Sequence, residues 1–291
     1  MAPFDSAARA SIRDLLNDAV TTLTRAGVEN AVLDAELMLA GVTGVSRAHV
    51  VTGSIALDEV VHRNYAALVD RRAAREPLAY ILGRKEFFAL DLEVTSDVLI
   101  PRPETETLVA AVLEELAELP APVLDLGTGS GAIALAVAAN APDAMVVASD
   151  ISDAALTVAR RNAARLGLAD QVVFRSADCF DVRDGRGSLG RFNLIVSNPP
   201  YVPDAEIPKL QPEITRWEPR LALAGGHDGL DFYRRIACHA PEYLDPVGQL
   251  LVEIGHSQAD AVTHLLNDAG FGAINRLHDP SGIVRVLVAR C

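Results

Sequence analysis

Cysteine is scarce in this chain of 291 residues, which contains only three. Cys179, Cys238 and Cys291 lie far apart and form no C-x-x-C pair. They therefore favour neither a disulfide framework nor a zinc site, and they indicate a reducing compartment. The seven histidines have no metal-ligand spacing, so we expect no metal site.

Long apolar runs and an excess of basic charge are also lacking. No apolar segment approaches the roughly 20 residues that a membrane helix needs, and the first residues do not have the basic flank and apolar core of a signal peptide. We therefore expect a cytoplasmic protein without a membrane partner. The net charge is −13, from 26 Lys and Arg residues against 39 Asp and Glu residues. This balance disfavours direct nucleic-acid binding, although it does not exclude a local basic groove.

The first part of the chain has the residue pattern of a helical domain, which we expect over residues 1–82. Ala, Leu and Arg recur there at spacings of three and four residues. The apolar stripes expected to face a core are Ile12, Leu15, Leu16, Ala19 and Leu23 in one helix, and Leu33, Leu37 and Ala40 in the next. A third helix is predicted from Leu57 to Ala74, before Pro77. No catalytic group is evident, so we interpret this region as a domain that docks on the substrate.

A β-hairpin linker is predicted over residues 83–100, because apolar and polar residues alternate from Leu90 onward. Residues 101–291 form a larger domain in which strands and helices alternate. This pattern is typical of an α/β fold with a doubly wound, mostly parallel sheet and helices on both faces. The seven expected strands are 123–126, 145–150, 172–174, 194–196, 249–254, 273–278 and 283–289. No helix separates the last two, so they should pair antiparallel.

A glycine-rich turn, Asp125-Leu-Gly-Thr-Gly-Ser-Gly, follows the first strand of this sheet. Glycine lets the backbone turn sharply and approach a ligand, and the next helix offers free N–H groups at its N-terminus. Asp150, at the tip of the second strand, can accept hydrogen bonds from both hydroxyls of a ribose. The pattern predicts a nucleoside cofactor but does not by itself exclude NAD. Asp178, after the third strand, either accepts from an adenine amino group or is a solvated loop acid.

The segment Ser197-Asn-Pro-Pro-Tyr directly follows the fourth strand, at the sheet edge where α/β proteins bind ligands. Its prolines fix φ and lack N–H donors, so the turn presents carbonyl acceptors. Asn198 adds a side-chain carbonyl, and Tyr201 adds a flat face with a polar tip. Two acceptors can hold both N–H bonds of a planar –NH₂ group and aim its nitrogen at an electrophile. With no metal and no nucleophilic residue, the electrophile that suits a nucleoside site is a sulfonium methyl group.

These residues also carry a family resemblance. Asp125–Gly131, Asp150 and Asn198–Tyr201 resemble the class I S-adenosylmethionine-dependent methyltransferases that modify –NH₂ groups. The likeness to the peptide chain release factor glutamine methyltransferases is more extensive and spans about residues 77–256. The helical N-terminal region, which lies mostly before this range, agrees with the extra domain of that family. Its further segments are Pro77-Leu-Ala-Tyr-Ile-Leu-Gly-Arg-Lys-Glu-Phe, Leu99-Ile-Pro-Arg-Pro-Glu-Thr-Glu, Glu218-Pro-Arg-Leu-Ala-Leu and Gly229-Leu-Asp-Phe-Tyr-Arg-Arg-Ile.

The resemblance implies an enzyme that methylates the glutamine of the Gly-Gly-Gln motif in class 1 peptide chain release factors. The methyl group of S-adenosylmethionine would pass to the side-chain amide nitrogen, leaving S-adenosylhomocysteine. For the cofactor, the resemblance implies Gly127, Thr128, Gly129, Ser130 and Gly131 around the methionine part, Asp150 at the ribose, Asp178 and Cys179 at the adenine, and Asn198. For the glutamine it implies Asn198, Pro199, Pro200 and Tyr201, of which Asn198, Pro199 and Tyr201 would be catalytic.

Two departures from the family pattern matter. The family often has Trp where Cys179 stands, so a stacking contact with the adenine is either lost or replaced, and Phe180 is the residue expected to replace it. The tail Asp279-Pro-Ser-Gly-Ile-Val-Arg also differs from the usual Asp-Leu-Ala-Gly-Arg-Asp-Arg, which weakens inferences about the last strand.

Three alternatives stay open at this point. A methyltransferase that acts on the amino group of adenine in nucleic acid uses a similar Asn-Pro-Pro-Tyr turn, but the acidic charge counts against it. An NAD-dependent oxidoreductase would use the glycine turn and leave Asn198–Tyr201 without a role. A module that binds release factors without catalysis would have no use for the cofactor turn.

Overall fold

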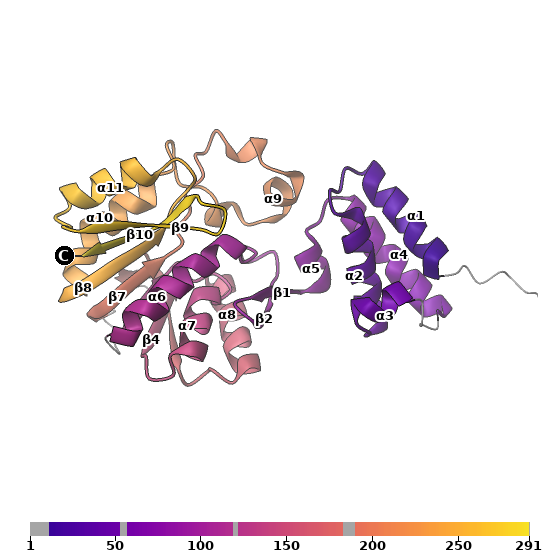
Figure 1. Ribbon diagram of the computed structural model, residues 1–291, viewed down its shortest axis with the longest axis horizontal. Coiled ribbons are helices and arrows are strands. Elements are labelled where there is room, and N and C mark those ends of the chain that lie inside the picture. The colour runs from indigo at the N-terminus through magenta and orange to yellow at the C-terminus, as the bar shows by residue number, and fades with distance from the viewer. Residues whose placement is uncertain (1–11, 53–56, 119–121, 183–189, 291) are drawn as a thin grey trace, which may run out of the picture. The chain divides into compact units, whose positions relative to one another are not determined.

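The computed structural model describes residues 12–52, 57–118, 122–182 and 190–290 (Figure 1). The chain divides into two compact units. The first comprises Met1–Gly83 together with Gln211–Trp217, and the second comprises Arg84–Leu210 and Glu218–Cys291. Among the described residues, no helix is both long and apolar enough to cross a lipid bilayer.

The first unit is helical. Its helices are α1 (Ile12–Arg25), α2 (Ala31–Thr43), α3 (Arg47–Thr52), α4 (Glu59–Ala73), α5 (Leu78–Leu82) and α9 (Pro212–Trp217). The carboxylate of Asp58 caps α4 by accepting from the Val61 N–H at 2.8 Å, so the predicted third helix is confirmed to within two residues. The stripe predicted in α1 is confirmed too, because Ala19 and Leu23 are buried in the core of this unit.

The buried face of α2 is not the predicted one. The prediction of a stripe through Leu33, Leu37 and Ala40 is wrong at Leu33, which is exposed. Ala40 is partly buried and packs against the core. The buried residues of α2 are Ala31, Asp34, Ala35, Met38 and Leu39. Most of the circumference of α2 is apolar, so residue spacing alone does not select the inward face. The core selects it, and Asp34 is tolerated there because its carboxylate accepts from Arg72 Nε at 2.7 Å.

Arg72 also joins α4 to α9, a helix that follows it by more than a hundred residues. Glu213 of α9 accepts from Arg72 Nη1 at 2.9 Å and from Arg75 Nε and Nη2 at 2.7 and 2.6 Å. Burial opposes ionisation of Glu213, but the hydrogen bonds from Arg75 and Arg72 outweigh it and lower its pKa to about 2. A segment from the middle of the chain is thereby fixed to the N-terminal helices by charge-assisted bonds.

The second unit begins with the predicted hairpin, formed by β1 (Arg84–Phe87) and β2 (Leu90–Glu93), which pair antiparallel. A sheet in the order β6-β5-β4-β3-β7-β8-β10-β9 follows. Its strands are β3 (Val123–Leu126), β4 (Val146–Asp150), β5 (Val172–Asp178), β6 (Asp181–Val182), β7 (Phe192–Ser197), β8 (Leu244–Glu253), β9 (Ile274–His278) and β10 (Val284–Arg290).

Helices cover both faces of this sheet (Figure 1). One core contains residues of α6 (Glu106–Glu118), α7 (Ala132–Asn140) and α8 (Asp153–Leu166), and the other contains residues of α10 (Asp231–Tyr243) and α11 (Ala259–Asp268). Ser152 caps α8, its hydroxyl accepting from the Ala155 N–H at 3.1 Å, and Gly167 ends the helix in the left-handed conformation. The doubly wound α/β fold is therefore confirmed.

The predicted seven strands are all present, and the described residues add an eighth. It is the two-residue β6, which turns back antiparallel on the end of β5. Residues 183–189, which follow this strand, lie outside the described residues. The last two strands pair antiparallel as expected, with β10 inserted between β8 and β9.

The glycine turn connects β3 to α7 with a left-handed backbone at three positions. Gly127, Gly129 and Gly131 have φ values of 73°, 56° and 84°. A Cβ at Gly131 would also lie 3.0 Å from Leu135 Cδ1 and 3.2 Å from the Cβ of Ala159. Glycine is thus required at Gly131 twice over, by the backbone conformation and by the close packing of α7 against α8.

Gly131→Ala should destabilise the second unit more than a matched glycine substitution does. Gly167 also has a positive φ, but a Cβ there meets nothing within 4 Å. We expect Gly167→Ala to lower the free energy of unfolding by about 1–2 kcal/mol, the cost of a left-handed non-glycine residue. Gly131→Ala should cost about 1–3 kcal/mol more, because the methyl group overpacks the core. Urea unfolding followed by circular dichroism measures both, and equal losses would contradict the packing argument.

Candidate active site

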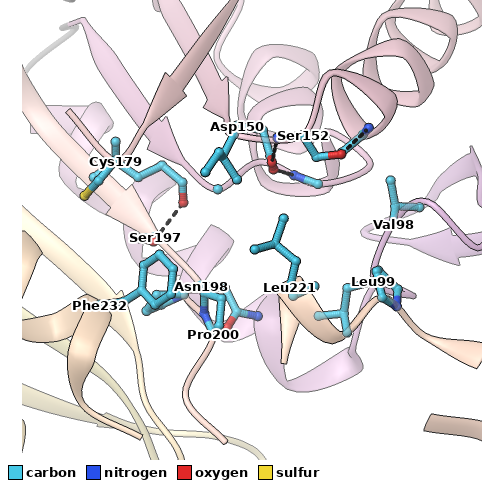
Figure 2. Close-up of a pocket in the computed structure, with 18 of the residues that line it drawn as sticks. Val98, Leu99, Asp150, Ser152, Cys179, Ser197, Asn198, Pro200, Leu221 and Phe232 are labelled. Carbon is cyan, nitrogen blue, oxygen red and sulfur yellow. Dashed lines mark hydrogen bonds between the residues drawn. The ribbon is translucent and has the colours of Figure 1, made fainter. Parts of the chain in front are cut away.

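A cleft opens at the carboxyl ends of the parallel strands, in the second unit (Figure 2). Ends of β3, β4, β5 and β7 contribute to its wall, as does α10 through Phe232 and Ile236. The segments Asp97–Leu99 and Pro219–Ala222 supply further lining residues. Open α/β sheets bind their ligands at this edge, outside the carboxyl ends of the strands.

The glycine turn and Asp150 meet at one side of this cleft. Asp150 Oδ2 accepts from the Gly129 N–H at 2.9 Å, and Oδ1 accepts from the Ser152 N–H at 2.9 Å. Burial raises the pKa of Asp150, while these backbone donors oppose the shift. A carboxylate has about four acceptor positions. Asp150 therefore keeps acceptor capacity toward the cleft that it lines together with Gly127 and Gly129.

The other residues of the turn face the protein interior. Thr128 is buried, and its hydroxyl donates to Asp125 Oδ2 at 2.6 Å. Ser130 is buried as well, and neither it nor Thr128 or Gly131 is among the residues that line the cleft. Burial raises the pKa of Asp125 to about 7, and its Oδ1 has no hydrogen-bond partner. Cofactor contacts by the side chains of Thr128 and Ser130 remain predictions that this geometry does not support.

Asp178, the last residue of β5, and Cys179 both line the cleft. The carboxylate of Asp178 accepts from Arg235 Nη2 at 2.6 Å, so the aspartate is held in an ion pair. Cys179 lies beside it with a φ of 58°, and burial raises the pKa of its thiol to about 11. Figure 2 shows Cys179 and Phe232 on the same side of the cleft.

Phe180 is not the aromatic residue at the cleft, so that expectation is wrong. It is buried in the core and stacks on Tyr243, with ring centroids 4.6 Å apart. Because the backbone of Cys179 is left-handed, the side chains of Cys179 and Phe180 point in different directions. Phe232, which the sequence analysis did not single out, lines the cleft instead.

The Asn-Pro-Pro-Tyr turn also borders the cleft, and Figure 2 shows Asn198 beside Phe232. Ser197, the last residue of β7, donates its hydroxyl hydrogen bond to the Leu126 carbonyl at 2.8 Å. Asn198, Pro199 and Pro200 line the cleft, whereas Tyr201 is not among its lining residues. Burial raises the pKa of Tyr201 to about 12.

Three residues that the sequence analysis did not select hold this turn in place. Thr105 accepts from Asn198 Nδ2 at 3.1 Å, and Glu253 lies 3.5 Å from the Tyr201 hydroxyl. Gln258 Nε2 donates to the Tyr201 and Gly229 carbonyls at 3.0 and 3.2 Å. Thr105 stands in a proline-rich segment whose family likeness is visible in the sequence, but the pairing with Asn198 is not. Among the described residues, no group of three or more His, Cys, Asp or Glu is placed to hold a metal ion.

Gln258→Ala should loosen the turn, because it removes three hydrogen bonds at once. Besides its two donor bonds, Gln258 accepts from the Gly255 N–H at 2.9 Å. We expect a loss of about 1–3 kcal/mol in the free energy of unfolding, since buried backbone groups lose their partners. Gln211→Ala, which removes one exposed bond to Glu29, is the control and should cost at most about 0.5 kcal/mol. An equal loss in the two variants by urea unfolding would contradict this role.

The fold and the site together define a methyltransferase. A methyltransferase from Pyrococcus furiosus superposes on this chain with a TM-score of 0.51 at 18% identity, covering 76% of this chain and 98% of that one. This likeness concerns the fold. Two family models match the sequence: the PrmC N-terminal domain over residues 14–83 and the methyltransferase small domain over residues 104–215.

Relatives with assigned names identify the family. The release factor glutamine methyltransferase of Geobacter sulfurreducens is 44% identical over 284 residues, which are 96% of each chain. The enzyme of the same name from Xylella fastidiosa strain 9a5c is 44% identical over 274 residues, covering 94% of this chain and 98% of that one. The chain belongs to the release factor glutamine methyltransferase family. The methyltransferase reading of the sequence is thereby confirmed, and the oxidoreductase and binding-module alternatives fall away.

Proposed function

We propose that this protein methylates the side-chain amide nitrogen of the glutamine in the Gly-Gly-Gln motif of class 1 peptide chain release factors, with S-adenosylmethionine as the methyl donor. The observation that carries the proposal is the Asn198–Tyr201 turn at the edge of the cleft. The membership of the family supports the same substrate. Because release factors act on ribosomes, the proposal also places the protein in the cytoplasm.

The turn offers acceptors and few donors to a bound amide. Pro199 and Pro200 have no N–H, so the backbone here presents carbonyl oxygens without competing donors. The Asn198 Oδ1 and the Pro199 carbonyl would each accept one N–H of the glutamine amide. Holding both bonds fixes the plane of the –NH₂ group and leaves the lone pair of its nitrogen directed along one line. The entropy of ordering the amide is then lost on binding and does not add to the barrier of the methyl transfer.

The residues around the cleft also fit the methyl donor. Asp150 keeps unused acceptor positions for a ribose, and the left-handed glycines Gly127 and Gly129 let the backbone approach a ligand. Apolar lining by Ile236 and Phe232 suits an adenine. S-adenosylmethionine, when bound, supplies an electrophilic methyl group on a sulfonium centre. Asn198 and Pro199 would orient the amide nitrogen in line with it, and the surplus proton of the methylated amide would leave to solvent.

The first unit has a separate task in this proposal. We assign residues 1–82 to docking of the release factor, residues 83–100 to a hairpin linker and residues 101–291 to catalysis. The helical unit supplies no residue to the cleft among those described, and its own core is complete. Its α9, which follows the Asn-Pro-Pro-Tyr turn in the chain, is fixed to it through Glu213.

The substrate assignment is tested by incubating the protein with labelled S-adenosylmethionine and either a purified class 1 release factor or DNA. We expect one added methyl group on the glutamine of the Gly-Gly-Gln motif, located by mass spectrometry of the digested protein. A release factor with Gln→Glu at that position is the control and should stay unlabelled. Label on adenine of the DNA, or no label on the glutamine, would overturn the proposal.

Two substitutions separate the roles of the turn and of Asp150. Asn198→Ala should lower kcat by about 100-fold or more, because an acceptor used in the transition state is lost. It should leave the Kd for S-adenosylmethionine largely unchanged. Asp150→Ala should instead raise that Kd, since the ribose loses its acceptor. Single-turnover kinetics and calorimetry measure the two effects, and the same change in both variants would contradict the division of roles.

A further inference from the structure

Beside the turn lies a buried carboxylate that the proposed reaction does not yet use. Glu253, the last residue of β8, is only 1% exposed, and its Oε2 has no hydrogen-bond partner. The Tyr201 hydroxyl lies 3.5 Å from Oε1, and the Thr105 hydroxyl is close enough to the carboxylate to lower its pKa. Burying an ionisable group so completely costs stability, so a functional reason for it is expected.

Thr105 connects this carboxylate to Asn198. It is the last residue of the 3-10 helix η1 (Pro103–Thr105), and it is 4% exposed. Its hydroxyl oxygen accepts from Asn198 Nδ2 at 3.1 Å. No described residue donates to Asn198 Oδ1, although Asn198 lines the cleft (Figure 2). The amide nitrogen of Asn198 is therefore engaged with the protein, and its amide oxygen is left for a ligand.

The direction of these hydrogen bonds follows from the chemistry of each group. An ionised carboxylate only accepts, so the Thr105 hydrogen points to Glu253. The Thr105 oxygen must then accept from its other neighbour, and only the –NH₂ end of the Asn198 amide can donate to it. Because the Asn198 amide is planar, its oxygen Oδ1 then points away from Thr105. Without Glu253, Thr105 could donate to Asn198 Oδ1 and turn the amide by 180°.

We propose that Glu253 and Thr105 are positioning residues, which orient the Asn198 amide so that its oxygen faces the nitrogen to be methylated. The inference rests on the proposed function of the turn. In the reversed orientation the Asn198 –NH₂ group would meet the substrate –NH₂ group, donor against donor. The acceptor that aims the nucleophile would then be replaced by a repulsive contact.

The surroundings of Glu253 give the arrangement a pH dependence. Burial raises the pKa of Glu253 to about 7, with Glu104 adding to the shift, while Thr105, Arg285 and Tyr201 oppose it. Tyr233 also faces it, donating its hydroxyl to the Glu253 carbonyl at 2.8 Å. Above this pKa the ionised carboxylate accepts from the Thr105 hydroxyl, and the Thr105 oxygen in turn accepts from the Asn198 –NH₂ group. Below this pKa the protonated carboxyl group can donate to the Thr105 oxygen. Thr105 is then free to donate to Asn198, and the orientation of the Asn198 amide is no longer fixed.

The hydroxyl is tested by Thr105→Val, which keeps the shape of the side chain, and by Thr105→Ser, which keeps the hydroxyl. We expect Thr105→Val to lower kcat about 10- to 100-fold, as a misplaced positioning group does, with an unchanged Kd for S-adenosylmethionine. Thr105→Ser should restore most of the rate. If Thr105→Val keeps full kcat, or if Thr105→Ser is equally slow, the proposal fails.

The carboxylate is tested by Glu253→Gln, which keeps size and removes the obligatory acceptor. In the unaltered protein kcat should rise as the pH increases through about 7, because the carboxylate form fixes the amide. In Glu253→Gln this step should disappear and kcat should be low at every pH. Glu115→Gln is the matched control: Glu115 accepts from Gln249, also in β8, away from the cleft, and its loss should leave the pH profile unchanged. An identical pH step in Glu253→Gln would overturn the role of Glu253.

A readout independent of activity separates this inference from the proposed function. Nuclear Overhauser contacts between the Asn198 side-chain NH₂ protons and the Thr105 methyl group, recorded on the full chain, report the amide orientation directly. We expect them above pH 8 in the unaltered protein and expect their loss in Glu253→Gln. Their absence from an active enzyme would overturn the inference alone. Their presence in a protein that does not methylate release factors would instead contradict the proposed function.

Discussion

Parallel pairing of β3 with its two neighbours places Leu126 opposite Ser149 of β4 on one side and Ser197 of β7 on the other. The residues that follow these three partners are Gly127, Asp150 and Asn198. They therefore leave the sheet at the same level and on the same edge, although they are separated by up to 71 positions along the chain. The cleft, and the places of Asp150 and of the Asn-Pro-Pro-Tyr turn beside it, all depend on this backbone register.

The register alone would leave these groups on loose loops, and a set of hydrogen bonds stiffens them. Asp150 holds the glycine turn through the Gly129 N–H, and Gln258 joins the Tyr201 carbonyl to Gly229 and Gly255. Ser197 fixes the start of the Asn-Pro-Pro-Tyr turn to the end of β3. Each bond satisfies a group that would otherwise lose water without compensation, so stability and preorganisation come from the same contacts.

Much of the fold was predictable because its signals are local. Alternating β-α-β patterns, the Ser152 cap and the glycine at Gly167 depend on residues close in the sequence. The inward face of α2 was not predictable, because a helix that is apolar on most sides is oriented by its partners, here through the Asp34–Arg72 pair. The same holds for Phe180 and Phe232: the left-handed backbone at Cys179 sends one into the core, and α10 brings the other to the cleft.

The sequence by itself determined the family, the α/β class and the residue types that surround the cleft. The motifs Asp125–Gly131 and Asn198–Tyr201 indicate the family and the cleft because the residues of each motif are adjacent in the sequence. Only the tertiary structure decided which groups complete the site from afar. Thr105 and Glu253 come from separate elements, and hydrogen-bond direction exists only once donor and acceptor are brought together. Pairings of this kind leave no periodic trace in one sequence, because distance and burial, not residue order, create them.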